Sequence, residues 1–141
     1  MNTAKANAAA NTITAERVPE CERLQTLPRH FGRYMILVED AVYQFTRRLV
    51  SEYTGEYWTF YELSNGGFYM APDSKPMRVY VDGNGFGNEM SADAIGITVC
   101  LFAFSHGSFQ YPNSSFARHY HLLREFACSH PEAALIAAAI D

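Results

Sequence analysis

An aromatic-rich stretch broken by two glycines constrains the fold of this 141-residue chain more than any other feature. Residues 57–72 read YWTFYELSNGGFYMAP, so bulky apolar side chains flank a Ser-Asn-Gly-Gly segment. Strands that turn back on themselves need residues that accept positive φ at the turn, and Asn-Gly-Gly supplies them. We therefore predict a β-hairpin with strands over Tyr57–Leu63 and Gly67–Ala71.

A third short strand is predicted after the hairpin. Residues 72–76 contain two prolines and interrupt the chain, and Met77–Val81 then has the composition of a strand. The simplest pairing is a three-stranded antiparallel meander. Asp82–Gly87, which reads DGNGFG, is expected to end the third strand as a glycine-rich loop.

Helical patterns occupy most of the remaining chain. Apolar residues at i, i+3, i+4 and i+7 indicate an amphipathic helix before the hairpin, and Ser91 is a suitable N-cap for a nearly all-apolar helix after the sheet, with Gly107 as its stop. Pro28 and Gly32 make Leu27–Tyr34 a structured lead-in and not a helix. The predicted helices cover Met35–Ser51, Ala92 to about Ser105, a segment from Pro112–Ser115 to His130, and Pro131–Ile140.

These elements predict a single α+β domain, in which a small three-stranded antiparallel β-meander packs with about four α-helices. The domain is expected over residues 16–141, after a flexible leader over residues 1–15. The leader has no apolar core of signal-peptide length. Ile95–Phe104 is shorter than the roughly 20 apolar residues of a membrane helix, so no membrane association is expected.

Cysteine usage and charge narrow the class of protein. Cys21, Cys100 and Cys128 are odd in number and widely spaced, which favours a reducing compartment and a cytoplasmic location. Cys100 and Cys128 lie in apolar runs and are predicted to be small core residues. With 15 acidic and 11 basic residues the net charge is −4, so strong direct DNA binding is not expected.

No motif for a metal or a cofactor stands out. Asp82–Gly87 has the glycines of a phosphate-binding loop but lacks a Lys-Ser/Thr ending, so a tight turn is the preferred interpretation. His119 and His121 are two residues apart, so on a helix they point to different faces and do not share a metal. Histidines at helix ends or on the surface are the default expectation. We therefore predict neither metal nor cofactor.

Two alternatives remain open at the sheet. Glu62 and Asp82 end neighbouring predicted strands, where they could form an acid–base pair, although capping and turn roles are the simpler explanation. Tyr57 and Tyr61 share one face of their strand. Those tyrosines and Tyr69 are either exposed for a protein contact or covered by a second layer.

The ordered set of motifs is similar to that of the ArdB/KlcA antirestriction family of plasmids and other mobile elements. Besides residues 57–72, the resemblance is carried by PRHFGRY (28–34), VDGNGF (81–86), SADAIGI (91–97), RHYH (118–121) and HPEAALIAAAID (130–141). It covers nearly all of the chain except the leader. The resemblance implies an α+β protein that protects incoming DNA by countering type I restriction enzymes, and it brings no catalytic residues.

Our first hypothesis is therefore a non-enzymatic inhibitor that acts on the type I restriction enzyme complex, directly or indirectly. It would block restriction through a protein contact or by interfering with the movement of the motor along DNA, and the sequence does not choose between these modes. With 18% charged residues and a net charge of −4 the chain has no dense carboxylate ladder, so it is not an acidic DNA mimic. The alternative is a small carboxylate-dependent enzyme acting on nucleic acid or a nucleotide. The candidate interaction surface comprises Glu62, Asn65, Asp82, Asn84, Phe86 and Asp141.

Overall fold

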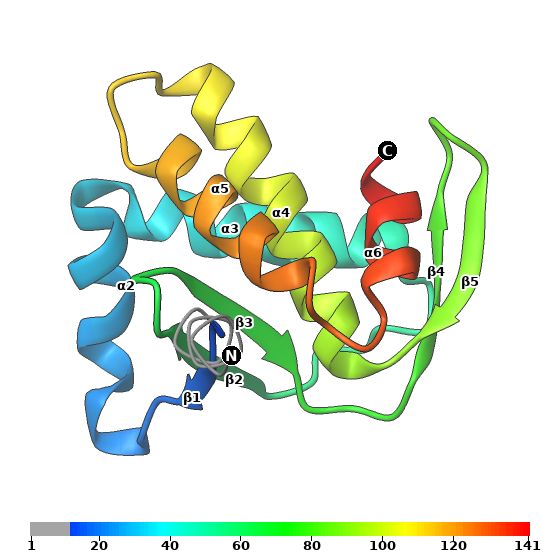
Figure 1. Cartoon of the computed structure of the whole chain (residues 1–141), viewed down its shortest axis with the longest axis horizontal. Helices are drawn as coiled ribbons and strands as arrows, with labels where there is room; N and C mark the ends of the chain where they lie inside the picture. Colours follow the sequence, from blue (N-terminus) through cyan, green and yellow to red (C-terminus); the bar gives the residue numbers. More distant parts are fainter. Residues whose placement is uncertain (1–11) are drawn as a thin grey trace, which may run out of the picture.

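A computed structural model of the chain describes residues 12–141 and confirms the α+β class. The described residues form five α-helices and two small antiparallel sheets (Figure 1). The strands are β1 (Ala15–Arg17), β2 (Trp58–Leu63), β3 (Phe68–Pro72), β4 (Met77–Val81) and β5 (Phe86–Met90). The helices are α2 (Arg23–Phe31), α3 (Met35–Leu49), α4 (Ala92–Gln110), α5 (Phe116–Ala127) and α6 (Ala133–Ile140).

The predicted hairpin is confirmed. Strands β2 and β3 are antiparallel, with Trp58 opposite Pro72 and Glu62 opposite Phe68. Gly66 has φ +92°, a conformation that suits glycine, and the Asn65 side chain accepts a hydrogen bond from the Gly67 N–H at 2.9 Å. The Asn-Gly-Gly turn thus folds for the local reason expected from its sequence.

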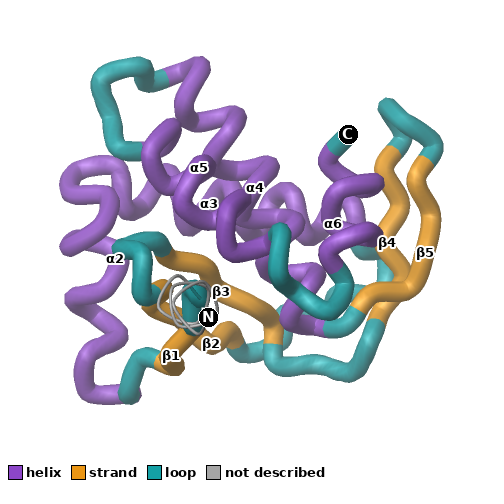
Figure 2. Tube along the Cα trace, viewed as in Figure 1, coloured by secondary structure: helices purple, strands orange, loops and turns teal. Residues whose placement is uncertain are grey.

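The predicted meander is wrong, because β4 does not join the sheet of β2 and β3. The chain between β3 and β4 leads away from that sheet, and β4 pairs with β5 in a separate two-stranded ribbon (Figure 2). Residues 82–85 of the predicted glycine-rich loop form the turn of this second hairpin, where Gly85 has φ +73°, whereas Phe86 and Gly87 already belong to β5. Strand β5, for which no strand was predicted, lies opposite β4 with Phe86 paired to Val81.

The third strand of the first sheet comes from the N-terminal side of the chain. Strand β1 pairs with β2 so that Arg17 lies opposite Tyr61, in a segment for which no strand was predicted. Thr14, within the predicted leader, accepts a hydrogen bond from the Ser64 N–H at 2.9 Å. The leader's end is therefore attached to the sheet, and its residues 1–11 lie outside the described residues.

Helix α4 is the centre of the fold. It packs against β3 and contacts α3, α5 and α6 (Figure 1). The predicted N-cap is confirmed, since Ser91 Oγ accepts from the Ala94 N–H at 3.1 Å. By length and composition α4 could cross a membrane, but most of it is buried inside the fold, as in a core helix of a soluble protein.

Helix α4 continues past the stop predicted at Gly107. A Cβ on that residue would lie 2.8 Å from the Phe116 ring, so the missing side chain makes room for α5 and does not end the helix. The prediction of a non-helical lead-in is wrong for residues 27–31, since α2 covers these residues with Pro28 inside it, and Gly32 (φ +53°) follows the end of the helix. Gly32 then opens a short 3-10 helix, Gly32–Tyr34, that leads into α3.

The structure also tests the expectations for the three tyrosines and for Cys100 and Cys128. The three tyrosines divide, because Tyr69 is buried against Phe126, Tyr61 is half-buried in a stack on Tyr69, and Tyr57 is 49% exposed. A second layer therefore covers part of the sheet only.

The expectation that Cys100 is a core residue is confirmed, whereas the same expectation for Cys128 is wrong, since that thiol is exposed at the end of α5.

Candidate functional site

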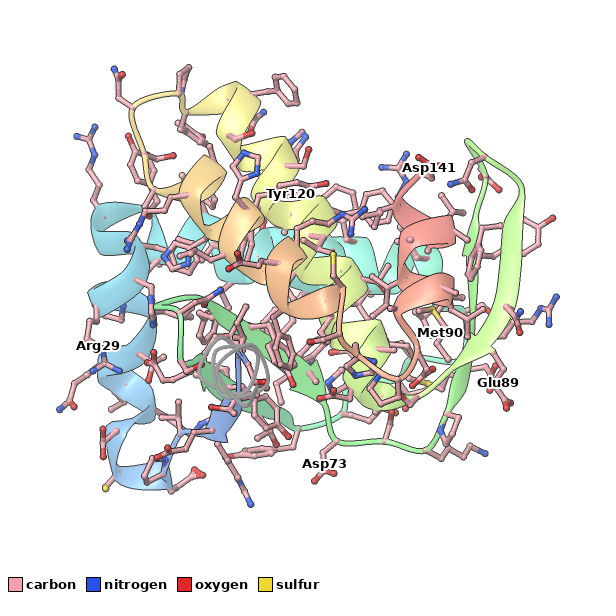
Figure 3. The ribbon with its side chains drawn as sticks, viewed as in Figure 1. Arg29, Asp73, Glu89, Met90, Tyr120 and Asp141 are labelled. Carbon is pink, nitrogen blue, oxygen red and sulfur yellow. The ribbon has the colours of Figure 1, made fainter. Side chains whose placement is uncertain are left out.

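The six predicted surface residues form two groups in the structure. Glu62 and Asn65 lie at the β2–β3 turn beside α2 and α5, whereas Asp82, Asn84 and Phe86 lie at the β4–β5 turn. Figure 3 shows Arg29, which binds Glu62, on the opposite side of the molecule from Asp141. The candidate surface is therefore not one continuous patch.

Glu62 is held by two basic side chains of α2. Arg29 Nη2 lies 2.6 Å from Glu62 Oε2, and His30 Nε2 lies 2.8 Å from Oε1. Burial alone raises the pKa of the Glu62 carboxyl, but the hydrogen bonds from Arg29 and His30 outweigh it and lower the pKa below its usual value. Glu62 is thus an ionised carboxylate that ties the sheet to α2, and both of its oxygens are occupied.

Next to His30 lies a buried histidine, His119, for which the sequence predicted a helix-end or surface position. The ring of His119 is 4.9 Å from that of His30 and 4.6 Å from that of Phe31, and its Nδ1 has no hydrogen-bond partner among the described residues. Burial, together with the nearby His30, lowers the pKa of His119 to about 4. The prediction of a surface position is therefore wrong for His119. The signal for its burial was its position one turn after Phe116, on the apolar stripe of α5.

Asn65 has a structural role in the same region. Its Nδ2 donates to the Leu122 carbonyl at 2.9 Å and to Glu125 Oε1 at 3.2 Å, while its Oδ1 accepts from Gly67. One side chain therefore shapes the turn and fastens it to α5. This arrangement leaves little of Asn65 for an external partner.

The β4–β5 turn is fastened in the same way to the last helix. Asn84 Nδ2 donates to the carbonyls of Ala138 and Ala139, at 3.2 Å and 3.0 Å, and its Oδ1 accepts from the Phe86 N–H. Phe86 is partly buried against the core. Asn84 therefore brings the turn next to the end of α6, so that the exposed residues Asp82 and Asp141 belong to one region of the surface.

The geometry does not join Glu62 and Asp82 into an acid–base pair. Glu62 contacts α2, and α2 and the β4–β5 turn lie on opposite sides of the molecule (Figure 1). Within residues 12–141 no group of three His, Cys, Asp or Glu side chains could hold a metal ion.

A second polar network, which was not predicted as a unit, surrounds the start of α4. Tyr69 donates to Asp93 Oδ1 at 2.7 Å, and His130 Nε2 lies 2.8 Å from Asp93 Oδ2. Burial and the Asp93 carboxylate raise the pKa of Tyr69, which stays a neutral donor. His130 Nδ1 accepts the Glu132 N–H at 3.0 Å, so Nε2 carries the proton and both ring nitrogens are used.

His130 and Asp93 are residue types that form catalytic acid–base pairs, but their hydrogen bonds here serve the fold. A base needs a free lone pair directed at a substrate, and the one lone pair of neutral His130 is bound to a backbone N–H. Glu132 in turn accepts hydrogen bonds from the N–H and the hydroxyl of Ser91. The network therefore connects β3, α4 and the α5–α6 turn.

In comparisons with known proteins, the chain matches antirestriction proteins both by family model and by sequence identity. A family model for antirestriction proteins matches residues 51–141. Two Escherichia coli proteins, each an antirestriction protein KlcA, are 47% and 45% identical to this chain over 135 and 137 residues. The alignments cover 92% of this chain in both cases, and 95% and 94% of the relatives.

A solved structure agrees at the level of the fold. It is 47% identical to this chain, has a TM-score of 0.85, and covers 92% of this chain and 95% of its own. It is described as showing, for the KlcA and ArdB proteins, a novel fold and antirestriction activity against type I DNA restriction systems in vivo but not in vitro. These matches confirm the resemblance inferred from the motifs, and the chain belongs to the antirestriction protein family.

Proposed function

We propose that this protein relieves restriction by type I restriction-modification enzymes inside the cell and so protects incoming mobile DNA. The observation that carries the proposal is the 47% identity, over 92% of the chain, to a KlcA structure described with that activity in vivo. The cytoplasm is the compartment where restriction of incoming DNA takes place, and three free cysteines are consistent with it.

The proposed action is inhibition without catalysis. The carboxylate of Glu62 is occupied by Arg29 and His30, and both nitrogens of His130 are hydrogen bonded. A net charge of −4 gives neither the carboxylate density of a DNA mimic nor the positive potential of a DNA-binding protein. A protein contact is the mode of inhibition that these properties favour.

The contrast between activity in vivo and none in vitro, described for the relatives, supports an indirect route. An inhibitor that needs only the purified restriction enzyme would act in both settings. We therefore infer that this protein acts on the type I complex together with a component that is present in the cell.

For the contact itself we propose the exposed end of the β4–β5 turn with the end of α6. Asp82 and Asp141 are exposed there for a contact, and Asn84, whose amide is used in the fold, holds the region in place through its hydrogen bonds to α6. Glu62, Asn65 and Phe86 support the fold around the two turns and serve the surface indirectly.

The test is the plating efficiency of unmodified phage on cells that carry a type I system, with and without this protein. Relief by the wild-type chain is expected, with modification of the host DNA unchanged, and its absence despite soluble expression would overturn the function. The variant Asp82→Asn/Asp141→Asn should lose most of the relief. Glu89→Gln, an exposed acid on the same ribbon, is the matched control. Full relief by the folded double variant would overturn the proposed surface.

A further inference from the structure

A cavity of about 370 Å³ lies between α3 and α4, and neither the six candidate surface residues nor the Asp93 network line it. Its size is within the range of clefts that bind ligands or side chains of a partner. Apolar side chains of both helices line it, including Phe45 and Ala103, and Phe116 at the start of α5 contributes to its lining. The cavity is therefore an open depression between three helices, and its lining mixes these apolar side chains with polar ones.

The lining residues recur at helical spacing on both walls, so the cavity is an elongated groove. Helix α3 contributes Leu37, Ala41, Gln44 and Arg48, and α4 contributes Ala103, His106, Gly107 and Gln110. Residues at such spacing lie on one face of a helix.

Large apolar side chains are exposed next to lining residues of the groove in both helices. Ile36 and Leu37 at the start of α3 are 68% and 43% exposed, and Phe109 at the end of α4 is 83% exposed. Single exposed apolar residues need no explanation, but several around one concave site are typical of a protein-binding surface. Leu37 lines the groove itself, and Ile36 and Phe109 are the chain neighbours of the lining residues Leu37 and Gln110.

The charges along α3 give the groove a direction. Asp40, Gln44 and Arg48 line it at successive turns, and Gln44 Nε2 donates to Asp40 Oδ2 at 2.7 Å. Eight residues of helix separate the acid from the base by about 12 Å, too far for them to pair. Arg48 has no ion pair among the described residues. One end of the groove is therefore acidic and the other basic.

We propose that this groove binds one amphipathic α-helix of a cellular partner protein. The apolar face of that helix would fill the groove, with a basic residue near Asp40 and an acidic residue about two turns away near Arg48. Binding of a helix in a groove is an established mode of recognition, and complementary charges fix its direction. The proposal rests on the proposed function, for which it specifies how the cellular component is recognised.

Shape favours a different protein over a second copy of this chain. In a symmetric dimer the same surface of each copy faces its partner, so two identical grooves would meet with their concave sides. Neither would fill the other, and the cavity would remain empty. A convex helix from another protein fills it.

The experiment places a photo-crosslinking amino acid at Gln44 of the full chain, in cells that carry the type I system. A discrete adduct with another protein is expected at position 44 and not at Glu89, on the β4–β5 ribbon. Arg48→Glu should reduce both the adduct and the relief of restriction about tenfold or more. Arg47→Glu is the matched control, because Arg47 is the exposed neighbour that does not line the cavity.

Gln44→Trp gives a second variant, since an indole at this exposed position would occupy the groove without changing its charge. Urea unfolding of each purified variant checks that it folds. The proposal is overturned if the adduct contains two copies of this chain or joins position 44 to residues 1–11 of the same chain. Absence of an adduct, or full relief by both folded variants, also overturns it. Relief by the wild type in the same cells tests the proposed function separately.

Discussion

Gly96 of α4 lies directly against the backbone of β3, so that a Cβ on this residue would be 2.5 Å from the carbonyl oxygen of Met70. One turn later, the Cys100 thiol lies 3.5 Å from the same oxygen. The central helix approaches the sheet this closely because residue 96 has no side chain. This contact sets the distance between the two layers on which the rest of the fold is built.

Gly96→Ala should therefore destabilise the protein, although alanine favours helix more than glycine does. The new methyl group would force α4 and β3 apart at a fully buried contact, where overpacking costs about 1–3 kcal/mol. The free energy of unfolding, measured in urea, should fall by about 1–3 kcal/mol. Gly83→Ala is the control, because nothing lies within 4 Å of that position. Equal stability of the two variants would show that the layers separate easily.

The parts of the fold that could be predicted from sequence are those with local causes. The Asn-Gly-Gly turn and the Ser91 cap each depend on residues within a few positions. Strands β1 and β5 have no such signature: Ala15–Arg17 and Phe86–Met90 contain residues that are poor strand formers. They are strands because a partner strand lies beside them, which is a long-range property.

The same distinction explains the candidate residues. Asn65 and Asn84 were predicted as surface candidates at the hairpin tip and in the glycine-rich loop, and in the structure each shapes its turn. Their second bonds, to α5 and α6, join residues more than 50 positions apart and have no sequence pattern. The groove between α3 and α4 could not be predicted either, since it depends on how far apart two amphipathic helices lie.

Asn65→Ala should cost roughly 1–3 kcal/mol of unfolding free energy. The substitution removes the bond to the Gly67 N–H and leaves the Leu122 carbonyl, which is part-buried, without its side-chain donor. Asn113→Ala, at an exposed position in the loop before α5, should change the unfolding free energy by less than about 0.5 kcal/mol. A loss at Asn65 no greater than at Asn113 would mean that the turn is held by its glycines alone.

Tyr69→Phe should destabilise the protein by about 1–2 kcal/mol, because it removes a buried hydroxyl that donates to Asp93. Tyr61→Phe is the matched control, since its ring stacks on Tyr69 at 4.8 Å but is only partly buried. Thermal unfolding of both variants and of His130→Gln would measure the network. If Tyr69 and His130 act through Asp93, the stability loss of the Tyr69→Phe/His130→Gln double variant should differ from the sum of the two single losses by at least about 0.5 kcal/mol. Strict additivity would show two independent bonds.

Acid should destabilise the protein through His119, which is buried and has a pKa of about 4 in the folded state, against an ordinary value of 6.5. Between these two values the unfolded chain binds a proton that the folded chain does not. The free energy of unfolding therefore falls as the pH is lowered from 6.5 to 4, by roughly 3 kcal/mol. Glu62, whose folded pKa is lowered, adds to the loss below about pH 4.5, since its contribution is complete only above that value.

His119→Leu isolates the contribution of this histidine. The variant keeps an apolar side chain among the rings of Phe31 and Phe104, so it should fold, and it has no proton to bind. Urea unfolding at several pH values from 7.5 to 4.5 should give a shallower decline for His119→Leu than for the wild type. His121→Leu, at the exposed position two residues later, should follow the wild-type slope. Parallel curves for all three proteins would show that the His119 ring takes up a proton in place, and that the cluster it forms with His30 and Phe31 opens to water without unfolding.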